Sequence, residues 1–167
     1  MAIVTVKQNF VTATDLTITL ASLASDTNLL SGRESTAIDA RTNGYADYLC
    51  SAKIRTGTSP TSGRVIELWF IGWDGSTWPD VFAGSDAART ISLSNNKSSI
   101  CRFFGSVTIT ATSNTDYYFG PVSVAQAFGG RMPGQWSVFC THSSGVALNS
   151  TAGNHFVRVQ GIYDTIG

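Results

Sequence analysis

This 167-residue chain contains few charged side chains. Lys, Arg, Asp and Glu make up 13% of it, about half of the usual share of about 25%. Eleven basic residues balance eleven acidic ones, and no run of like charge occurs. Such a chain has no electrostatic field that would gather nucleic acid or an anionic membrane, so we expect neither as a partner.

Long hydrophobic runs and a secretion signal are also missing. The longest apolar runs, such as Leu68 to Ile71, have the length of a strand, far below the roughly 18 to 20 residues that span a bilayer. The first ten residues contain no basic segment followed by an apolar stretch. We therefore expect synthesis and residence in the cytoplasm.

Cysteine pairs and metal-binding patterns are absent too. Cys50, Cys101 and Cys140 lie far apart and form no CxxC motif. Each stands in an apolar, strand-like context, which predicts three reduced and buried thiols. The two histidines, His142 and His155, have no Cys or Glu spaced to complete a zinc shell. We expect no metal and no cofactor.

The sequence also offers little for catalysis. Its glutamates are Glu34 and Glu67, and most aspartates stand in turn contexts such as Asp74-Gly75, which disfavours the paired carboxylates of a glycosidase. There is no G-x-S-x-G motif, and Gly129-Gly130 is not followed by the Lys and Ser or Thr of a phosphate-binding loop. The chain is predicted not to be an enzyme.

Short stretches of alternating apolar and polar residues run through the whole chain, separated by Gly, Asn, Asp and Pro. They predict about eight strands. The stretches are residues 15–23, 45–56, 64–73, 91–111 with a bulge at Gly105, 117–124, 135–141 and 154–163. The segment 57–63 is a turn, Asp74-Gly75 signals a hairpin, and residues 122–128 suffice for one helical turn. Because the loops are too short for helical crossovers, we expect a single antiparallel β-sandwich, all-β and jelly-roll-like.

The chain divides into an N-terminal stretch, residues 1–14, and a sandwich domain, residues 15–167. Val4 and Val6 alternate with polar residues, so the stretch could add as a strand to a sheet edge on a neighbouring protein. It could equally be the first strand of its own sandwich. Val4, Val6 and Phe10 are its candidate contact residues.

Aromatic residues concentrate around one expected strand. Trp69, Trp73 and Trp78 lie close together in the sequence, and such a group suits a sugar-stacking platform, a core or a subunit interface. Trp69 and Trp73 share one face of the strand, while Leu68 and Phe70 share the other. One set is expected to pack the domain and the other to meet a protein partner.

The segment 128–136 is a second interface candidate. Gly129-Gly130 and the following proline frame Arg131 and Met132, and both residue types are enriched at protein interfaces. Trp136 follows at the end of the segment and is included as a candidate. The alternative is a surface turn that merely joins two strands.

Several segments resemble a group of small structural proteins from the virions of tailed bacteriophages. They are Val4–Asn9, Gly84–Ala88, Pro121–Pro133 with Trp136, Ala147–His155 and Gly161–Tyr163. The resemblance implies a virion component made in the host cytoplasm, most simply a decoration (cement) protein of the capsid that works as a homo-oligomer, often a trimer. Its partners would be the major capsid protein or other virion proteins, with head, neck and tail all open as locations. The alternative is a carbohydrate-binding or tail-associated adhesion module.

Overall fold

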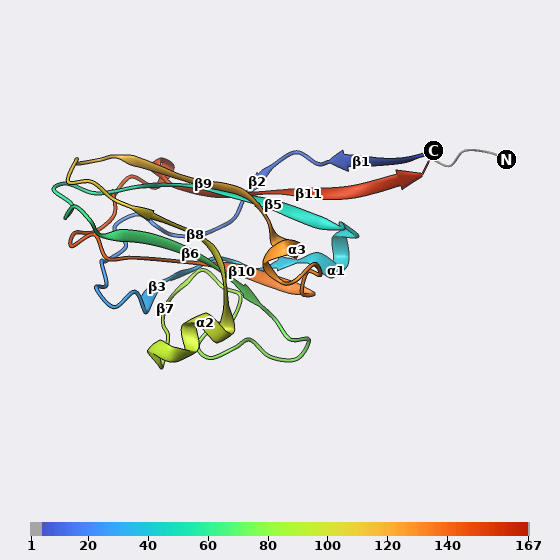
Figure 1. Ribbon diagram of the computed structural model, residues 1–167, viewed down its shortest axis with the longest axis horizontal. Helices are drawn as coiled ribbons and strands as arrows, with labels where there is room; N and C mark the ends of the chain where they lie inside the picture. The colour runs from blue at the N-terminus through green and yellow to red at the C-terminus, as the bar shows by residue number, and fades with distance from the viewer. Residues whose placement is uncertain (1–4, 167) are drawn as a thin grey trace.

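The computed structural model describes residues 5–166 as two antiparallel sheets packed face to face (Figure 1). The first sheet has the strand order β1-β11-β5-β9, with β2 also paired to β11; the second has the order β7-β3-β10-β6-β8, with β4 paired to β10. The strands are β1 (Val6–Phe10), β2 (Thr14–Asp15), β3 (Ser31–Glu34), β4 (Ile38–Asp39), β5 (Asp47–Arg55), β6 (Val65–Gly72), β7 (Ala87–Thr90), β8 (Cys101–Thr108), β9 (Asp116–Ser123), β10 (Gln135–His142) and β11 (Phe156–Ile166). The predicted all-β antiparallel sandwich is confirmed.

Eight of these strands form a jelly roll. In chain order, β1, β3, β5, β6, β8, β9, β10 and β11 give two four-stranded sheets, β1-β11-β5-β9 and β3-β10-β6-β8. This is the double-sheet arrangement of two Greek keys. The short strands β2, β4 and β7 are additions to it, so the described residues form eleven strands where about eight were expected.

Within residues 5–166, helical structure is confined to single turns. These are α1 (Ala40–Asn43), α2 (Lys97–Ile100), α3 (Val124–Ala127) and the 3₁₀ turns Ser94–Asn96 and Ala152–Asn154. The turn expected within residues 122–128 is therefore confirmed as α3. Among the described residues, no helix has the length and hydropathy needed to cross a membrane.

The main core fills the space between the sheets. Inward residues of β5 alternate with half-buried outward ones, as the sequence pattern predicts. Phe70 of β6 stacks on Phe104 of β8, with 4.7 Å between ring centroids, and meets the edge of Trp136 at 5.7 Å. β6 lies between β10 and β8, which confirms its expected central position.

The other face of the second sheet is covered by the chain itself. Residues 73–100, here called the cover segment, contribute Phe82 and Ile91 to a second cluster with Ile71, Cys101 and Phe139. The strand face that carries Trp69 was expected to meet a protein partner. It meets the cover segment instead, because the long excursion between β6 and β8 folds back over it.

A buried carboxylate anchors the cover segment to the sheet. Glu34 of β3 accepts hydrogen bonds from the backbone N–H groups of Ala83 and Gly84, at 3.1 and 2.7 Å, and from Ser137 Oγ at 3.0 Å. Arg89 Nε lies 2.8 Å from the same carboxylate. These donors offset the free-energy cost of burying the Glu34 carboxylate.

Three local expectations are wrong. The stretch 91–111 becomes a strand only from Cys101 to Thr108, because residues 94–100 form the helical turns Ser94–Asn96 and Lys97–Ile100. Residues 16–20 form no strand, although Leu16 and Leu20 are buried. The segment crosses from β2 in the first sheet to β3 in the second, and its apolar residues point into the core from this corner. Asp74-Gly75 makes no hairpin: Asp74 accepts from the N–H groups of Ser76 and Thr77, and the resulting turn leads into the cover segment.

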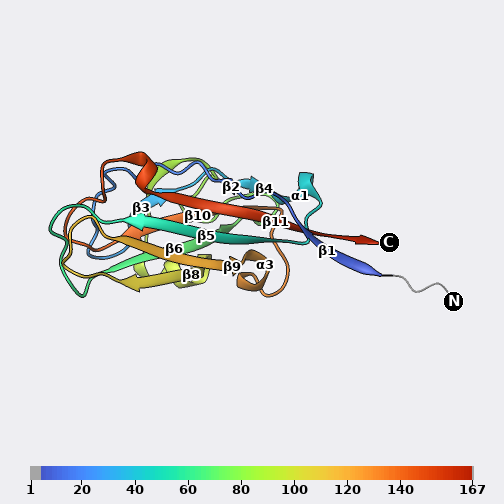
Figure 2. The same cartoon turned by 90° about the horizontal axis from the view of Figure 1, so that it is seen from above.

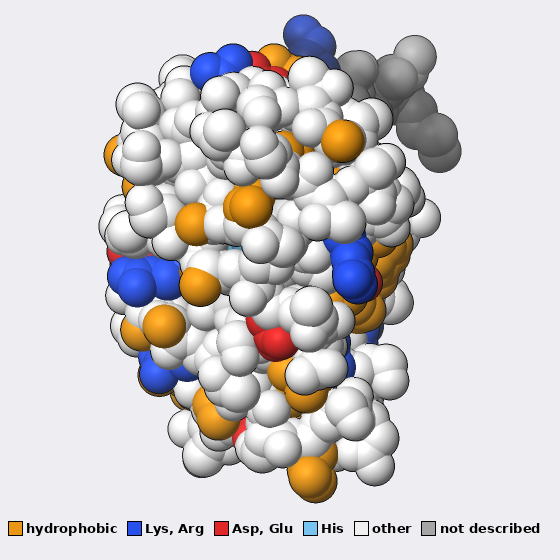
Figure 3. Space-filling view, turned by 90° about the vertical axis from the view of Figure 1, so that its left-hand side faces the viewer, with side chains coloured by type: hydrophobic (Ala, Val, Ile, Leu, Met, Phe, Trp, Pro, Cys, Tyr) orange, Lys and Arg blue, Asp and Glu red, His pale blue; other side chains and the backbone are white. Residues whose placement is uncertain are grey.

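The strands β1 and β11 extend beyond the body of the sandwich (Figures 1 and 2). The last pair between β11 and β5 is Ile162 with Asp47, whereas β1 pairs with β11 from Phe10 opposite Ile162 to Val6 opposite Ile166. Residues 6–10 and 162–166 thus form a two-stranded projection, here called the ribbon. The loop-bearing end of the sandwich opposite the ribbon displays mostly uncharged surface (Figure 3).

Candidate partner-binding site

The ribbon exposes large apolar side chains. Val6, Phe10 and Ile166 have 62%, 51% and 79% of their surface exposed. Only three other large hydrophobic residues of the described part are exposed, namely Leu93, Phe103 and Tyr118. The exposure of Val6 and Phe10 is compatible with the contact role expected for them, and Val4 lies outside the described residues.

These side chains share one face of the ribbon. Val6 stands opposite Ile166 and Phe10 opposite Ile162, and residues spaced by two point to the same side of a strand. Tyr163 points to the other side, where it packs against Tyr45 with 6.1 Å between ring centroids. The apolar face is therefore continuous with the outer face of the first sheet, away from the core.

The backbone edges of the ribbon are open as well. β1 pairs with β11 on one side, and beyond Ile162 β11 pairs with β1 alone. In an antiparallel pair, the N–H and C=O groups of alternate residues point away from the partner strand. A two-stranded ribbon is marginally stable in water, and exposed edges invite further pairing. The ribbon is thus the part of the described chain most suited to completion by another protein.

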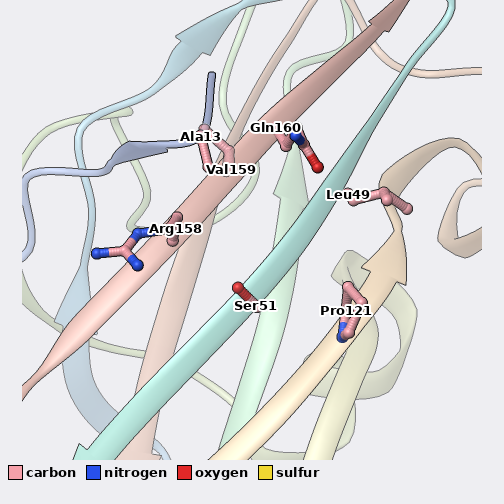
Figure 4. Close-up of a pocket in the computed structure, with 7 residues that line it drawn as sticks. All are labelled: Ala13, Leu49, Ser51, Pro121, Arg158, Val159 and Gln160. Atoms are coloured by element: carbon pink, nitrogen blue, oxygen red, sulfur yellow. The ribbon is translucent and has the colours of Figure 1, made fainter. Parts of the chain in front are cut away.

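A shallow groove lies on the same outer face, over the body of the sandwich (Figure 4). Ser51 of β5 forms its floor, because this short side chain leaves a depression between larger neighbours. Leu49, Pro121, Ala13 and Gln160 stand around it, and the groove has a volume of about 200 Å³. The strands β11, β5 and β9 carry Gln160, Leu49 and Pro121, and Ala13 belongs to the segment between β1 and β2.

Two cations flank an aromatic ring beside the groove. Lys53 Nζ lies 5.8 Å and Arg158 Cζ 4.5 Å from the ring centroid of Phe156. Arg158 also forms an ion pair with Asp15 at 2.6 Å. Lys53 stands opposite both Phe156 and Tyr118 in the strand register, so an aromatic and cationic row crosses the sheet. Among the described residues, no carboxylate lies within ion-pair distance of Lys53.

The segment 128–136 projects at the ribbon end of the sandwich. Gly129 and Gly130 adopt φ values of 78° and 96°, which other residues rarely accept. Arg131 is exposed beyond them, whereas Met132 is half-buried and packs against the main core. A concave surface of about 410 Å³ lies between this segment and Tyr45.

The structure excludes Trp136 as an interface residue. Its side chain is fully buried and packs on Phe70 and Tyr48. The expectation is wrong because β10 is an inner strand, covered by the first sheet on one face and by the cover segment on the other.

The remaining tryptophans do not form an open sugar-stacking platform. Lys97 Nζ lies 4.9 Å over the ring of Trp69, and Arg41 Cζ lies 4.9 Å over that of Trp73. Trp69 also donates from Nε1 to Glu67 at 3.0 Å. Trp78 packs against the second hydrophobic cluster. Each of these half-buried rings has partners within its own chain.

The two histidines form hydrogen bonds with loop residues. The ring nitrogens of His142 lie 2.8 Å from Ser144 Oγ and 3.0 Å from the carbonyl oxygen of Leu23, and burial lowers the pKa of this imidazole. His155 Nε2 lies 2.9 Å from the carbonyl oxygen of Asn149. The described residues contain no cluster of His, Cys, Asp or Glu placed to hold a metal ion.

The cysteines are all free and buried, as predicted. Burial raises the pKa of Cys101 and of Cys140 to about 12, and it raises that of Cys50 further. Such thiols are protonated at neutral pH and poor nucleophiles.

Sequence reasoning missed the C-terminal half of the ribbon. Residues 162–166 contain the strand-forming residues Ile162, Tyr163, Thr165 and Ile166, which is a weak signal for a strand. Nothing local in the chain indicates that they pair with residues 6–10, because this pairing joins the two ends of the sequence.

Neither protein-family models nor curated proteins match this chain. Among solved structures, it is similar to a chain from a structure of infectious bursal disease virus, Gx strain. The two share 15% sequence identity with a TM-score of 0.32. The match covers 98% of this chain and 40% of the viral chain, so the present chain spans less than half of that protein's length. A likeness of this extent carries no argument about function.

Proposed function

We propose that this chain is a non-enzymatic structural protein of a tailed-bacteriophage virion. In its specific form, the proposal is a decoration protein that is made in the host cytoplasm, binds the head shell and works as a homo-oligomer, with a trimer as the first expectation. The major capsid protein is the proposed partner on the particle. The sequence segments that resemble phage virion proteins support it, and jelly rolls occur in viral capsid proteins as well as in lectins.

The ribbon is the observation that carries the proposal. It exposes Val6, Phe10 and Ile166 on one face and leaves two strand edges open. A free monomer would keep this surface in water, whereas an assembled protein would bury it. Strand addition and apolar contact are both available to a partner there.

The low charge of the chain suits an assembly role. A module that bridges neighbouring subunits of a shell depends on apolar and backbone contacts, and the cores of such interfaces are depleted of charged residues. With 13% charged residues and zero formal net charge, the chain has little self-repulsion to oppose close packing.

Negative-stain imaging of purified virions with a gold-labelled antibody against the chain tests the proposal. We expect regular labelling of the head. Labelling confined to the neck or tail would contradict the decoration role, and unlabelled virions that also lack the chain by mass spectrometry would contradict the virion role.

Variants of the ribbon connect this test to the structure. The V6D/F10D double variant places two charges on the apolar face, and we expect its incorporation into virions to fall at least tenfold. Leu93→Asp is the matched control, because Leu93 is similarly exposed, at 57%, and lies in the cover segment. Equal incorporation of both variants would show that the ribbon does not make the attachment.

A further inference from the structure

One continuous surface links the ribbon to the groove. β11 runs from Phe156 in the body to Ile166 at the ribbon tip, and its pairings with β5 and β1 proceed without a register shift. Residues 158 and 160 beside the groove therefore point to the same face as residues 162, 164 and 166 of the ribbon. An apolar projection and a depression lie at successive levels of one sheet face.

We propose that the ribbon of one copy docks on the outer face of the first sheet of a second copy. Phe10 of one copy would occupy the groove over Ser51 of the other. The proposal deepens the function proposed above and rests on it in one respect, namely that a protein partner completes the ribbon. It assigns that partner as a second copy of this chain.

The groove fits one large apolar side chain. Its walls include Leu49, Pro121 and Ala13, its volume is about 200 Å³, and the hydroxyl of Ser51 lies at the floor. Phe10 is half exposed on the ribbon, at 51%, and projects from the same face. Burying such a ring in an apolar depression is the kind of contact that dominates protein interfaces.

Charge complementarity selects a second copy as the occupant. Asp164 is exposed on the apolar face of the ribbon, and no cation of the described residues lies within ion-pair distance of it. Lys53 on the body contacts the ring of Phe156 and has no ion-pair partner among the described residues. One surface thus bears an isolated acid and the other an isolated base, each beside apolar groups.

The strand register brings these two charges to the same level. Phe10 stands opposite Ile162, and Asp164 is two residues further toward the tip. On the body, Ser51 stands opposite Arg158, and Lys53 stands opposite Phe156, two residues further in the other direction. When the strands of the two copies run in opposite directions, placing Phe10 at the groove also places Asp164 at the level of Lys53. Sheets packed face to face in this way lie about 10 Å apart.

The contact joins two different surfaces, the ribbon of one copy and the body of the next. Because β1 and β5 lie two strands apart in the sheet, the contact forms once per copy in a head-to-tail arrangement that can close as a ring. Each copy then places its Asp164 against Lys53 of the next copy, and the measured mass gives the number of copies.

A charge exchange tests the contact. The mass of the wild-type chain and of the D164K, K53D and D164K/K53D variants would be measured by light scattering across a concentration series. We expect the wild type to be oligomeric and the dissociation constant of each single variant to be about tenfold higher. The double variant should recover most of the lost affinity, because it restores the opposite charges. Lys7→Asp is the matched control on the opposite face of the ribbon and should leave the oligomer unchanged.

Two results would overturn the proposal. The first is a wild-type chain that remains monomeric at the highest concentration. The second is that both single variants associate as strongly as the wild type, or that the double variant associates no more strongly than the single variants. Thermal unfolding of every variant confirms that the fold itself is retained.

Disulfide trapping provides a second, independent measurement. The three native cysteines are buried, so new surface thiols can be oxidised selectively. The D164C/K53C variant should give covalent dimers or larger species on a non-reducing denaturing gel, whereas D164C/L93C and D164C alone should not. Equal cross-linking in all three variants would contradict the proposed register.

The outcome separates this proposal from the proposed function. The chain could be found on virions and yet be monomeric and insensitive to the charge exchange. This result would support the structural role but exclude a second copy as the partner of the ribbon, and the capsid protein would then be the proposed partner. A charge-sensitive oligomer that is absent from virions would retain the interface and remove the virion role.

Discussion

The strand β11 runs through both the body of the sandwich and the ribbon, and the two regions differ in what covers this strand. In the body, Val157 and Val159 of β11 are buried between the two sheets. In the ribbon, Asp164 and Ile166 of the same strand are exposed and have one neighbouring strand, β1. The alternation of side chains continues across both regions. What changes is the second layer, because no strand of the second sheet lies under the ribbon (Figure 1).

This difference separates two uses of apolar residues. Where a second sheet is present, alternation makes a core that stabilises the chain by itself. Where it is absent, the same alternation leaves an apolar face and open edges that only another molecule can cover. The body should therefore determine stability, and the ribbon should determine association.

The largest expected effect is at the centre of the core. Phe70→Ala removes a fully buried ring that stacks on Phe104, and we expect the free energy of unfolding to fall by about 3–5 kcal/mol. Urea denaturation followed by tryptophan fluorescence measures it. A loss below about 1 kcal/mol would contradict the assignment of this cluster as the main source of stability.

A pH-dependent contribution of intermediate size comes from Asp86 at the corner of the body. Burial would raise the pKa of this carboxyl, but hydrogen bonds from Arg33 Nε, at 2.5 Å, and from Thr19 outweigh it and lower the pKa to about 2. A lowered pKa stabilises the fold above the ordinary value near 4, and this contribution is lost as the pH falls from about 4 to about 2.

Asp86→Asn should therefore reduce stability at pH 7 by about 1–2 kcal/mol, after allowance for partial exposure of the pair. The difference from the wild type should shrink toward pH 2. Chemical denaturation at a series of pH values measures both curves. A constant difference from pH 7 to pH 2 would show that the carboxylate charge is not responsible.

A small effect on stability is expected in the ribbon. Phe10→Ala truncates a half-exposed side chain, and the unfolding free energy of the dilute, monomeric chain should change by less than about 0.5 kcal/mol. Backbone amides of residues 6–10 should also exchange with solvent faster than those of β10. A loss comparable to that of Phe70→Ala would remove the distinction between the two regions.

The smallest expected effect is the reaction of the three cysteines of the body with a thiol reagent in the native protein. Because burial raises the pKa of Cys101 and Cys140 to about 12, a thiol reagent at pH 8 should label none of the three residues in the native protein. All three should react once the chain is unfolded in denaturant. Rapid labelling of the native protein would indicate that the body opens locally.

The sequence predicted much of the body and part of the ribbon. The alternation in residues 45–56 and 64–73 corresponds to β5 and β6, and the bulge expected at Gly105 appears as a register shift between β6 and β8. The thiols and the helical turn α3 were also predicted correctly. Residues 6–10 do form the first strand of their own sandwich, although they project from it.

Two of the wrong predictions share one cause. The alternation in residues 15–23 indicated a strand, but Leu16 and Leu20 face the core from a corner between sheets. Trp136 was assigned to an interface because a turn precedes it, yet β10 is covered on both faces. In each case the local sequence pattern indicated that an apolar side chain would be buried. It did not indicate which part of the molecule would cover that side chain.

Composition and alternation by themselves determined that this chain folds as an antiparallel sandwich with buried thiols, since side-chain periodicity and turn residues act over a few neighbouring positions. Tertiary structure alone decided that the cover segment occupies the Trp69 face and that residues 162–166 pair with residues 6–10. These outcomes depend on contacts between segments far apart in the chain. Their free energy comes from burial and strand pairing that exist only once the whole sandwich has formed.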